Sequence, residues 1–207
     1  MGRGGLALWW RCYFAAVTRI ISGRAGGLRL ATPSGSGTRP TSDRVREALF
    51  SRLDHLEVVE GAHVLDLYAG SGALGLEALS RGAASVLLVE SDKRAATVTR
   101  RNAAAMDAPG SVVRQGAVAR VLASPPPRRF SLVFSDPPYD LPEDALAGDF
   151  TLLVEHRWLT DDALVVVERS ARSPEPRWPV DWELEGERRY GETKVWFAGP
   201  RSPDVVA

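Results

Sequence analysis

Short runs of apolar residues alternate along the chain with longer segments in which apolar residues recur every three or four positions. The runs predict buried strands over residues 64–67, 85–89, 112–114, 130–134 and 163–167. The periodic segments predict a helix from a cap at Thr41 or Ser42 to Leu56, and helices over residues 73–79, 93–106 and 141–159. This alternation predicts a doubly wound α/β sheet, mostly parallel, with helices on both faces.

Two further segments have the alternation of β-hairpins. Residues 182–190 and 193–198 alternate about a turn at Gly191, and they predict an antiparallel pair that closes the sheet at its C-terminal end. Residues 18–30 predict a small N-terminal hairpin of two short strands, in which Gly26-Gly27 has the composition of a two-residue turn.

A length of 207 residues suits one α/β domain with a modest extension. Residues 6–17 are apolar and aromatic apart from Arg11, and they are too few to cross a bilayer. Arg3 ahead of the apolar run leaves a signal peptide as an alternative, and we favour a dispensable extension or an early start codon. The expected parts are residues 1–17 as the extension, 18–40 as a basic hairpin and linker, 41–199 as the α/β domain, and 200–207 as a tail.

Cysteine and histidine usage narrows the compartment and the chemistry. A single cysteine, Cys12, excludes an internal disulfide and fits a reducing, cytoplasmic location. The three histidines, His55, His63 and His156, have no spacing typical of metal ligands, so we expect no metal site. We also expect a monomer with no membrane association.

The net charge is zero, but the charges are segregated. Residues 1–46 contain eight arginines and one acidic residue, Asp43, whereas the rest of the chain is acidic in balance. Segregation of this kind favours contact between the N-terminal part and a polyanion, with a solvated basic tail as the alternative. The hairpin would carry Arg19, Arg24 and Arg29.

The stretch at residues 63–79 has the order strand, glycine turn, helix. Gly70 and Gly72 permit a tight turn and a close backbone approach, and the helix that follows presents free N–H groups to a ligand. The spacing Gly70-x-Gly72-x-x-Gly75 also fits the fingerprint of a dinucleotide site, so an NAD-dependent oxidoreductase is one interpretation. S-adenosylmethionine is the other, because a carboxylate at Asp66 suits a ligand ammonium better than a pyrophosphate.

Two more positions at strand ends carry candidate chemistry. Glu90 follows the second strand of the α/β domain and is placed to accept hydrogen bonds from a ribose diol. Asp136-Pro137-Pro138-Tyr139 follows the fourth strand. Its carboxylate and rigid carbonyls would accept the two protons of an exocyclic amine, and its tyrosine ring would stack on a planar base. Transfer of a methyl group to such an amine needs placement and removal of a proton, for which Asp136 is the candidate.

These motifs resemble those of class I, Rossmann-like methyltransferases that act on amino groups with S-adenosyl-L-methionine. With the stretches at residues 18–23, 39–50 and 65–81 added, the chain is similar to the bacterial RsmD family over residues 18–198. The resemblance implies methylation of the N2 amino group of a guanine in small-subunit ribosomal RNA, either as free RNA or in the assembled small ribosomal subunit. The base would be flipped into the site, and the basic hairpin would bind the RNA.

The resemblance also assigns site residues. The residues expected to bind the cofactor are Asp66, Tyr68, Gly70, Ser71, Gly72, Gly75, Glu90, Ser91, Gly116, Ala117, Arg39 and Thr41. The catalytic set is Asp136, Pro137, Pro138 and Tyr139. The stretch Gln115-Gly116-Ala117 lacks the acid that many relatives use for the adenine amino group. Alternative functions are an adenine-N6 methyltransferase on DNA or RNA, the NAD-dependent oxidoreductase, and an RNA-binding protein without catalysis.

Overall fold

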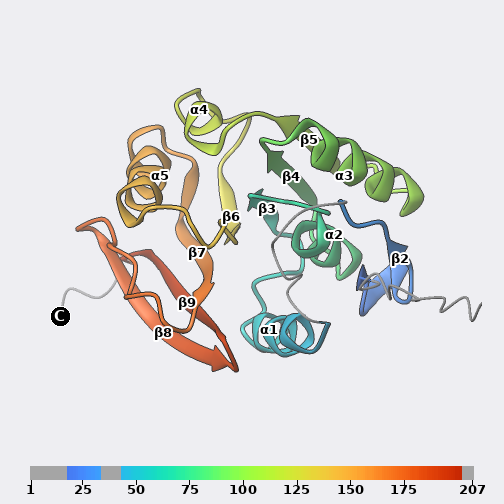
Figure 1. Ribbon diagram of the computed structural model, residues 1–207, viewed down its shortest axis with the longest axis horizontal. Helices are drawn as coiled ribbons and strands as arrows, with labels where there is room; N and C mark the ends of the chain where they lie inside the picture. The colour runs from blue at the N-terminus through green and yellow to red at the C-terminus, as the bar shows by residue number, and fades with distance from the viewer. Residues whose placement is uncertain (1–17, 34–42, 202–207) are drawn as a thin grey trace, which may run out of the picture.

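The computed structural model of the protein describes residues 18–33 and 43–201. A seven-stranded sheet runs through its centre in the order β5-β4-β3-β6-β7-β9-β8 (Figure 1). The strands are β3 (His63–Leu67), β4 (Ser85–Glu90), β5 (Ser111–Gln115), β6 (Phe130–Ser135), β7 (Leu159–Ser170), β8 (Trp182–Tyr190) and β9 (Thr193–Pro200). Strands β3 to β7 pair in parallel, and β8 and β9 add an antiparallel hairpin beside β7. The doubly wound, mostly parallel sheet expected from the sequence is confirmed.

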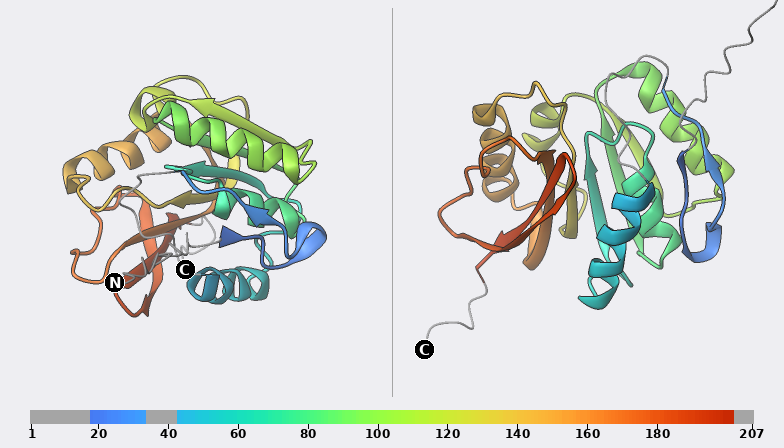
Figure 2. Two further views of the ribbon diagram at one scale, coloured as in Figure 1. Left: turned by 45° about the vertical axis from the view of Figure 1, so that its right-hand side comes forward. Right: turned by 60° about the horizontal axis from the view of Figure 1, so that its bottom comes forward.

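Helices cover both faces of the sheet (Figure 2). One face carries α1 (Asp43–His55), α2 (Ala73–Ser80) and α3 (Lys93–Ala105), and the other carries α4 (Val118–Leu122) and α5 (Glu143–Glu155). Alternate side chains of β3 serve the two cores, because successive strand residues point to opposite faces. Val64 packs in the core of α1 and α2, whereas Leu65 and Leu67 pack in the core that contains Phe150 of α5.

The helix predicted over residues 141–159 ends earlier than its apolar pattern indicated. Arg157 adopts a left-handed conformation with φ of 55°. The N–H of Trp158 donates to the carbonyl of Leu153 at 3.0 Å, and the N–H of Arg157 donates to that of Val154 at 3.0 Å. These two bonds form a Schellman motif, which closes the helix without the usual glycine. The chain then enters β7 at Leu159, so the apolar residues there belong to a strand. Helix α4 was not predicted.

The N-terminal hairpin, residues 18–30, pairs only β1 (Thr18–Arg19) with β2 (Arg29–Leu30), and a 3₁₀ turn, η1 (Gly23–Ala25), lies between them. The prediction of a two-residue hairpin turn at Gly26-Gly27 is wrong. Gly26 has φ −51° and ψ 133°, and Gly27 has φ 86°, which is the geometry of a type II turn. A type II turn does not match the twist of a two-residue hairpin, and the two arms pair instead across a longer loop, where the N–H of Ile20 donates to the carbonyl of Leu28 at 2.9 Å.

Buried polar side chains of α2 fix the hairpin to the α/β domain. The carboxylate of Glu77 is fully buried and accepts hydrogen bonds from the N–H groups of Ile21 at 2.6 Å and Ser22 at 3.1 Å. It also accepts one from Nε of Arg81 at 2.7 Å. The hydroxyl of Ser80 donates to the carbonyl of Ser22 at 2.6 Å. The hairpin is therefore a fixed part of the domain surface.

Replacing Glu77 by alanine should lower the free energy of unfolding by about 3 kcal/mol, because two backbone donors and the Arg81 guanidinium lose a buried acceptor. Urea denaturation of the purified variant measures this change. Glu155→Ala, at an exposed position of α5, is the control and should change stability by less than about 0.5 kcal/mol. Equal effects of the two substitutions would contradict the role given to Glu77.

Candidate active site

The candidate residues gather where the winding of the sheet reverses direction. From β3 the chain passes through α2 to β4 on one side, and from β6 it passes through α5 to β7 on the other. The last residues of these two strands, Leu67 and Ser135, are direct neighbours in the sheet. The loops that follow them therefore start side by side, at the kind of switch point where α/β sheets bind ligands. We call residues 68–72 the glycine loop and residues 136–142 the proline loop.

The space around the three glycines of the fingerprint differs from one position to the next. A Cβ on Gly75 would lie 2.7 Å from Cγ2 of Val86, and one on Gly72 would lie 2.9 Å from Cγ2 of Thr99. Both positions are filled by the packing of α2 and α3 on the sheet. At Gly70, which has φ 57°, only a carbonyl oxygen at 3.9 Å lies near the position of a Cβ. The open space for a ligand is therefore at Gly70.

Both acids of the cofactor prediction contact the backbone around the glycine loop. Oδ2 of Asp66, which is 2% exposed, accepts a hydrogen bond from the N–H of Gly75 at 2.9 Å. Oε2 of Glu90 accepts one from the N–H of Gly70 at 2.8 Å, and its Oε1 accepts one from the N–H of Asp92 at 2.7 Å. The two carboxylates thus shape the loop before any ligand is considered.

Burial raises the pKa of Asp66 to about 7, and the nearby charge of Glu90 acts in the same direction. The hydrogen bond from Gly75 opposes both effects. With this pKa, the carboxyl group of Asp66 changes between its protonated and ionised forms near neutral pH. A cation placed close to it would favour the ionised form.

Two residues that the sequence analysis missed hold the glycine loop from α3. The hydroxyl of Thr99 contacts the carbonyl of Gly70 at 2.7 Å. The amide nitrogen of Asn102 donates to the carbonyl of Ser71 at 2.8 Å and to that of Ala31 at 2.9 Å. Thr99 and Asn102 are buried, polar and three residues apart on one helix. That spacing is the one signal in the sequence that points to them.

Tyr68 also lies at the glycine loop, with φ 61°. Its hydroxyl donates a hydrogen bond to Oδ2 of Asp149, a buried residue of α5. Burial raises the pKa of Asp149, and burial with the adjacent carboxylate raises the pKa of Tyr68. The side chain of Tyr68 therefore connects the glycine loop to α5.

The proline loop presents its residues at different depths. Asp136 is half-buried and Pro137 is buried, whereas the side chain of Tyr139 is 52% exposed. A turn closed by the N–H of Leu141 and the carbonyl of Pro138, at 2.9 Å, follows the two prolines. An exposed ring beside a partly buried carboxylate suits a planar ligand that carries a hydrogen-bond donor.

The other predicted cofactor residues lie at the same edge of the sheet. Ser91 follows β4, and the N–H of Gly116, after β5, donates to the carbonyl of Glu90 at 2.9 Å. Ala117 precedes α4 and is exposed. Arg39 and Thr41, together with the predicted helix cap, lie outside the described residues.

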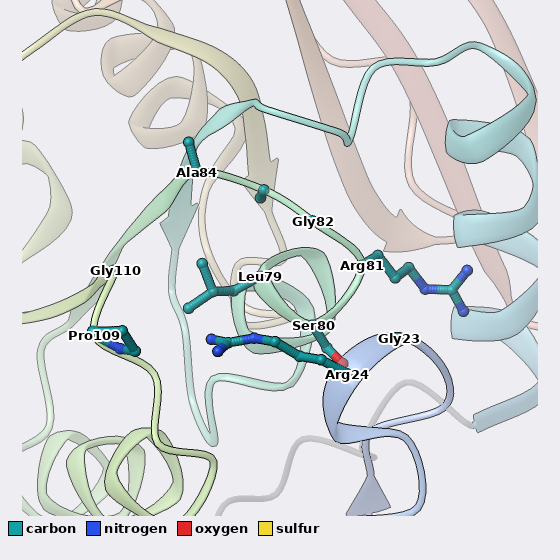
Figure 3. Close-up of a pocket in the computed structure, with 10 residues that line it drawn as sticks. Gly23, Arg24, Leu79, Ser80, Arg81, Gly82, Ala84, Pro109 and Gly110 are labelled. Atoms are coloured by element: carbon teal, nitrogen blue, oxygen red, sulfur yellow. The ribbon is translucent and has the colours of Figure 1, made fainter.

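The three arginines of the hairpin are exposed, but they do not form one cluster. Arg19 and Arg29 are direct cross-strand partners, and Nε of Arg19 lies 3.2 Å from Oδ2 of Asp43. Like charges directly opposite in a sheet repel, so Arg19 and Arg29 together favour an anion bound between them and solvent. Arg24 lies at η1, over a hollow of about 510 Å³ lined by Leu79, Ser80 and Pro109 (Figure 3). This hollow is at the amino ends of the strands, away from the glycine loop.

Within residues 18–33 and 43–201, no group of three histidine, cysteine or acidic side chains could hold a metal ion. In the same residues, no helix is long and apolar enough to cross a membrane.

The fold and the two loops define a class, the methyltransferases with a Rossmann-like fold. The solved structure of the protein yhhF from Escherichia coli matches with a TM-score of 0.77 and 37% identity, over 89% of this chain and 98% of that chain. The sequence also matches the family described as Conserved hypothetical protein 95, over residues 18–199.

Two relatives give the family its functional name. The chain is 39% identical over 175 residues to ribosomal RNA small subunit methyltransferase D of Escherichia coli K12, which covers 84% of this chain and 85% of the relative. It is 35% identical over 178 residues to the protein of the same name from Haemophilus influenzae, which covers 84% and 89%. The chain belongs to this family, so the resemblance to RsmD proteins is confirmed.

The raised pKa of Asp66 predicts a pH-dependent stability. Between pH 5 and pH 8 the unfolded chain carries an ionised aspartate, whereas folded Asp66 keeps its proton until about pH 7. The protein should therefore lose stability as pH rises through this interval, by an amount on the order of 2 kcal/mol from this group. Asp66→Asn should remove that loss, measured by urea unfolding at pH 5 and 8. Asp140→Asn is the exposed control, and parallel pH profiles of wild type and Asp66→Asn would contradict the prediction.

Proposed function

We propose that the protein transfers a methyl group from S-adenosyl-L-methionine to the exocyclic N2 amino group of a guanine in small-subunit ribosomal RNA. One observation carries the proposal: the glycine loop and the proline loop begin side by side, at the ends of the neighbouring strands β3 and β6. Membership of a family that contains ribosomal RNA small subunit methyltransferases supports methyl transfer to ribosomal RNA. The choice of guanine N2 rests on the resemblance to the RsmD family, and the flipping of the base rests on the need to take a paired or stacked base out of its helix before its amine can react.

The residues around the glycine loop fit S-adenosylmethionine. Gly70 leaves open space, and Glu90 lies at the adjacent strand end, where an acid meets a ribose diol. Asp66 and Glu90 place two carboxyl groups under the loop, which suits a cationic ligand. Bound there, the cofactor supplies a methyl group on a sulfonium, a centre that is already activated for transfer. NAD, whose pyrophosphate is anionic, suits this arrangement less well.

The proline loop would hold the target base. Acceptors on Asp136 and the adjacent backbone would bind the two protons of the exocyclic amine and aim its lone pair at the methyl carbon. The amine nitrogen would gain a methyl group and a positive charge as the thioether left, and it would then have to lose one proton. Asp136 would accept that proton directly or pass it to water. The exposed ring of Tyr139 would stack on the flipped base.

An adenine-N6 methyltransferase uses the same acceptors for a different amine, so the product distinguishes it. Small ribosomal subunits that lack the modification should accept labelled methyl groups from S-adenosylmethionine, and nucleoside digestion should yield N2-methylguanosine. Labelled N6-methyladenosine would overturn the choice of base. An absence of label on both subunits and free RNA would overturn the proposed substrate.

Asp136→Ala should lower kcat at least about 100-fold, because the carboxylate that accepts hydrogen bonds from the substrate amine and removes its proton is lost. The dissociation constant for S-adenosylmethionine should stay within about twofold, because the glycine loop is intact. Steady-state methylation at saturating substrate and calorimetric titration measure the two quantities. Asp140→Ala, at the exposed side of the same loop, is the matched control. Loss of both properties in Asp136→Ala would instead assign Asp136 a structural role.

Replacing Arg19, Arg24 and Arg29 together by glutamine should weaken binding to the RNA and reduce the slope of log K against log salt. The expected reduction is roughly 0.7 to 0.9 for each phosphate that the variant no longer neutralises. Arg29 should contribute more than Arg19, since Arg19 is paired with Asp43. The control replaces Arg172, Arg188 and Arg189, which are exposed at the other end of the sheet. An unchanged slope would remove the hairpin from the RNA interface.

A further inference from the structure

The side chain of Arg169, near the end of β7, contacts the backbone of the proline loop. This side chain is buried, with 4% exposure, although it carries a permanent charge. Nη1 donates to the carbonyl of Pro138 at 3.2 Å, and Nη2 donates to the carbonyl of Leu141 at 2.9 Å. Nη2 also lies 2.7 Å from Oε1 of Glu143, in the first turn of α5. One guanidinium thus holds both sides of the turn that presents Tyr139.

The proline loop needs a donor from outside. Pro137, Pro138 and Pro142 have no N–H groups, so the loop has few donors with which to fix its own carbonyls. A guanidinium supplies several donors in a rigid fork, and charge-assisted bonds to carbonyls are about twice as strong as neutral ones. The Pro138 carbonyl therefore has two structural partners, the N–H of Leu141 and the guanidinium of Arg169, which leaves the binding of a substrate amine to positions nearer the end of β6.

The strand that carries Arg169 does not need its side chain. β7 pairs with β6 as far as Val167 and with β9 from Val165 to Ser170, where Arg169 is the partner of Lys194. The backbone at Arg169 is thus fixed by the ladder to β9. A buried arginine here takes a large desolvation cost, which the contacts to the proline loop and Glu143 offset. The arrangement stabilises the loop more than the strand.

A second buried contact joins the same helix to the glycine loop. Tyr68 donates to Asp149, two turns along α5 from Glu143. Helix α5 is therefore tied at its start to Arg169 and the proline loop, and at its middle to the glycine loop. The relative placement of the two loops depends on these contacts as well as on the sheet.

We propose that Arg169 is a positioning residue for methyl transfer, which holds residues 138–141 so that Asp136 and Tyr139 keep the orientation that the target base requires. This inference rests on the proposed function. Arg169 acts through the backbone of the proline loop and touches neither the cofactor nor the base. Its loss should therefore lower kcat and leave cofactor binding unchanged, because small misplacements of reacting groups cost large factors in rate.

The test compares Arg169→Met and Arg169→Lys with a control, Lys194→Met. The control removes a charged residue of the neighbouring strand β9 that pairs with Glu187. Methylation of unmodified small ribosomal subunits should show kcat lowered about 10- to 100-fold in Arg169→Met. Arg169→Lys, which restores one charged donor, should recover part of that loss. All three variants should bind S-adenosylmethionine within about twofold of wild type, and Lys194→Met should keep its kcat.

Hydrogen–deuterium exchange on the ligand-free proteins separates this inference from the proposed function. Peptides that cover residues 139–146 should exchange faster in Arg169→Met, whereas those that cover β7 and the glycine loop should be unchanged. A wild-type kcat in Arg169→Met, or equal loss of kcat and cofactor binding, would overturn the inference. If wild type methylates no RNA, the proposed function fails, and unchanged exchange over residues 139–146 would still reject the role of Arg169.

Discussion

The hydrogen bonds from the backbone around the glycine loop to two buried carboxyl groups are the constraint on which the site depends. The N–H of Gly75 needs Asp66, and the N–H of Gly70 needs Glu90, because buried donors without acceptors are costly. The acids that suit a cationic cofactor are thus also the groups that shape its loop. A substitution at either acid would therefore act on the fold and on ligand binding together.

The N-terminal hairpin is connected to the same constraint through α3. Asn102 binds the carbonyl of Ser71 in the glycine loop, and it exchanges two hydrogen bonds with Ala31 just after β2. The segment that follows the hairpin is therefore held next to the glycine loop. Glu77 and Ser80 fix the other end of the hairpin near the C-terminal end of α2. A basic surface fixed at both ends can present its arginines to RNA with little loss of conformational entropy on binding.

The sequence predicted those features that depend on local pattern. Apolar runs located all five parallel strands, and strand-end position located Asp66, Glu90 and Asp136. The misses involve contacts that a local pattern does not contain. Arg157 ends α5 in a left-handed conformation with Schellman bonding. The type II turn at Gly26-Gly27 lies in a hairpin whose residues Ile21 and Ala25 bond to side chains of α2. Arg169 was invisible because its partners are backbone carbonyls about thirty residues away in the chain. A charged residue in an apolar strand gives no indication of its partner.

The two loops of the site are held by groups of opposite charge, and this difference fits what each would bind. Carboxyl groups under the glycine loop favour a cation above it. A guanidinium beside the proline loop binds the carbonyls of Pro138 and Leu141. Asp136 follows the end of β6, next to the glycine loop because Leu67 pairs with Ser135. Anchors of opposite sign, two carboxyl groups on β3 and β4 and a guanidinium on β7, would therefore hold the two loops so that an amine and a cationic methyl donor meet at the same point.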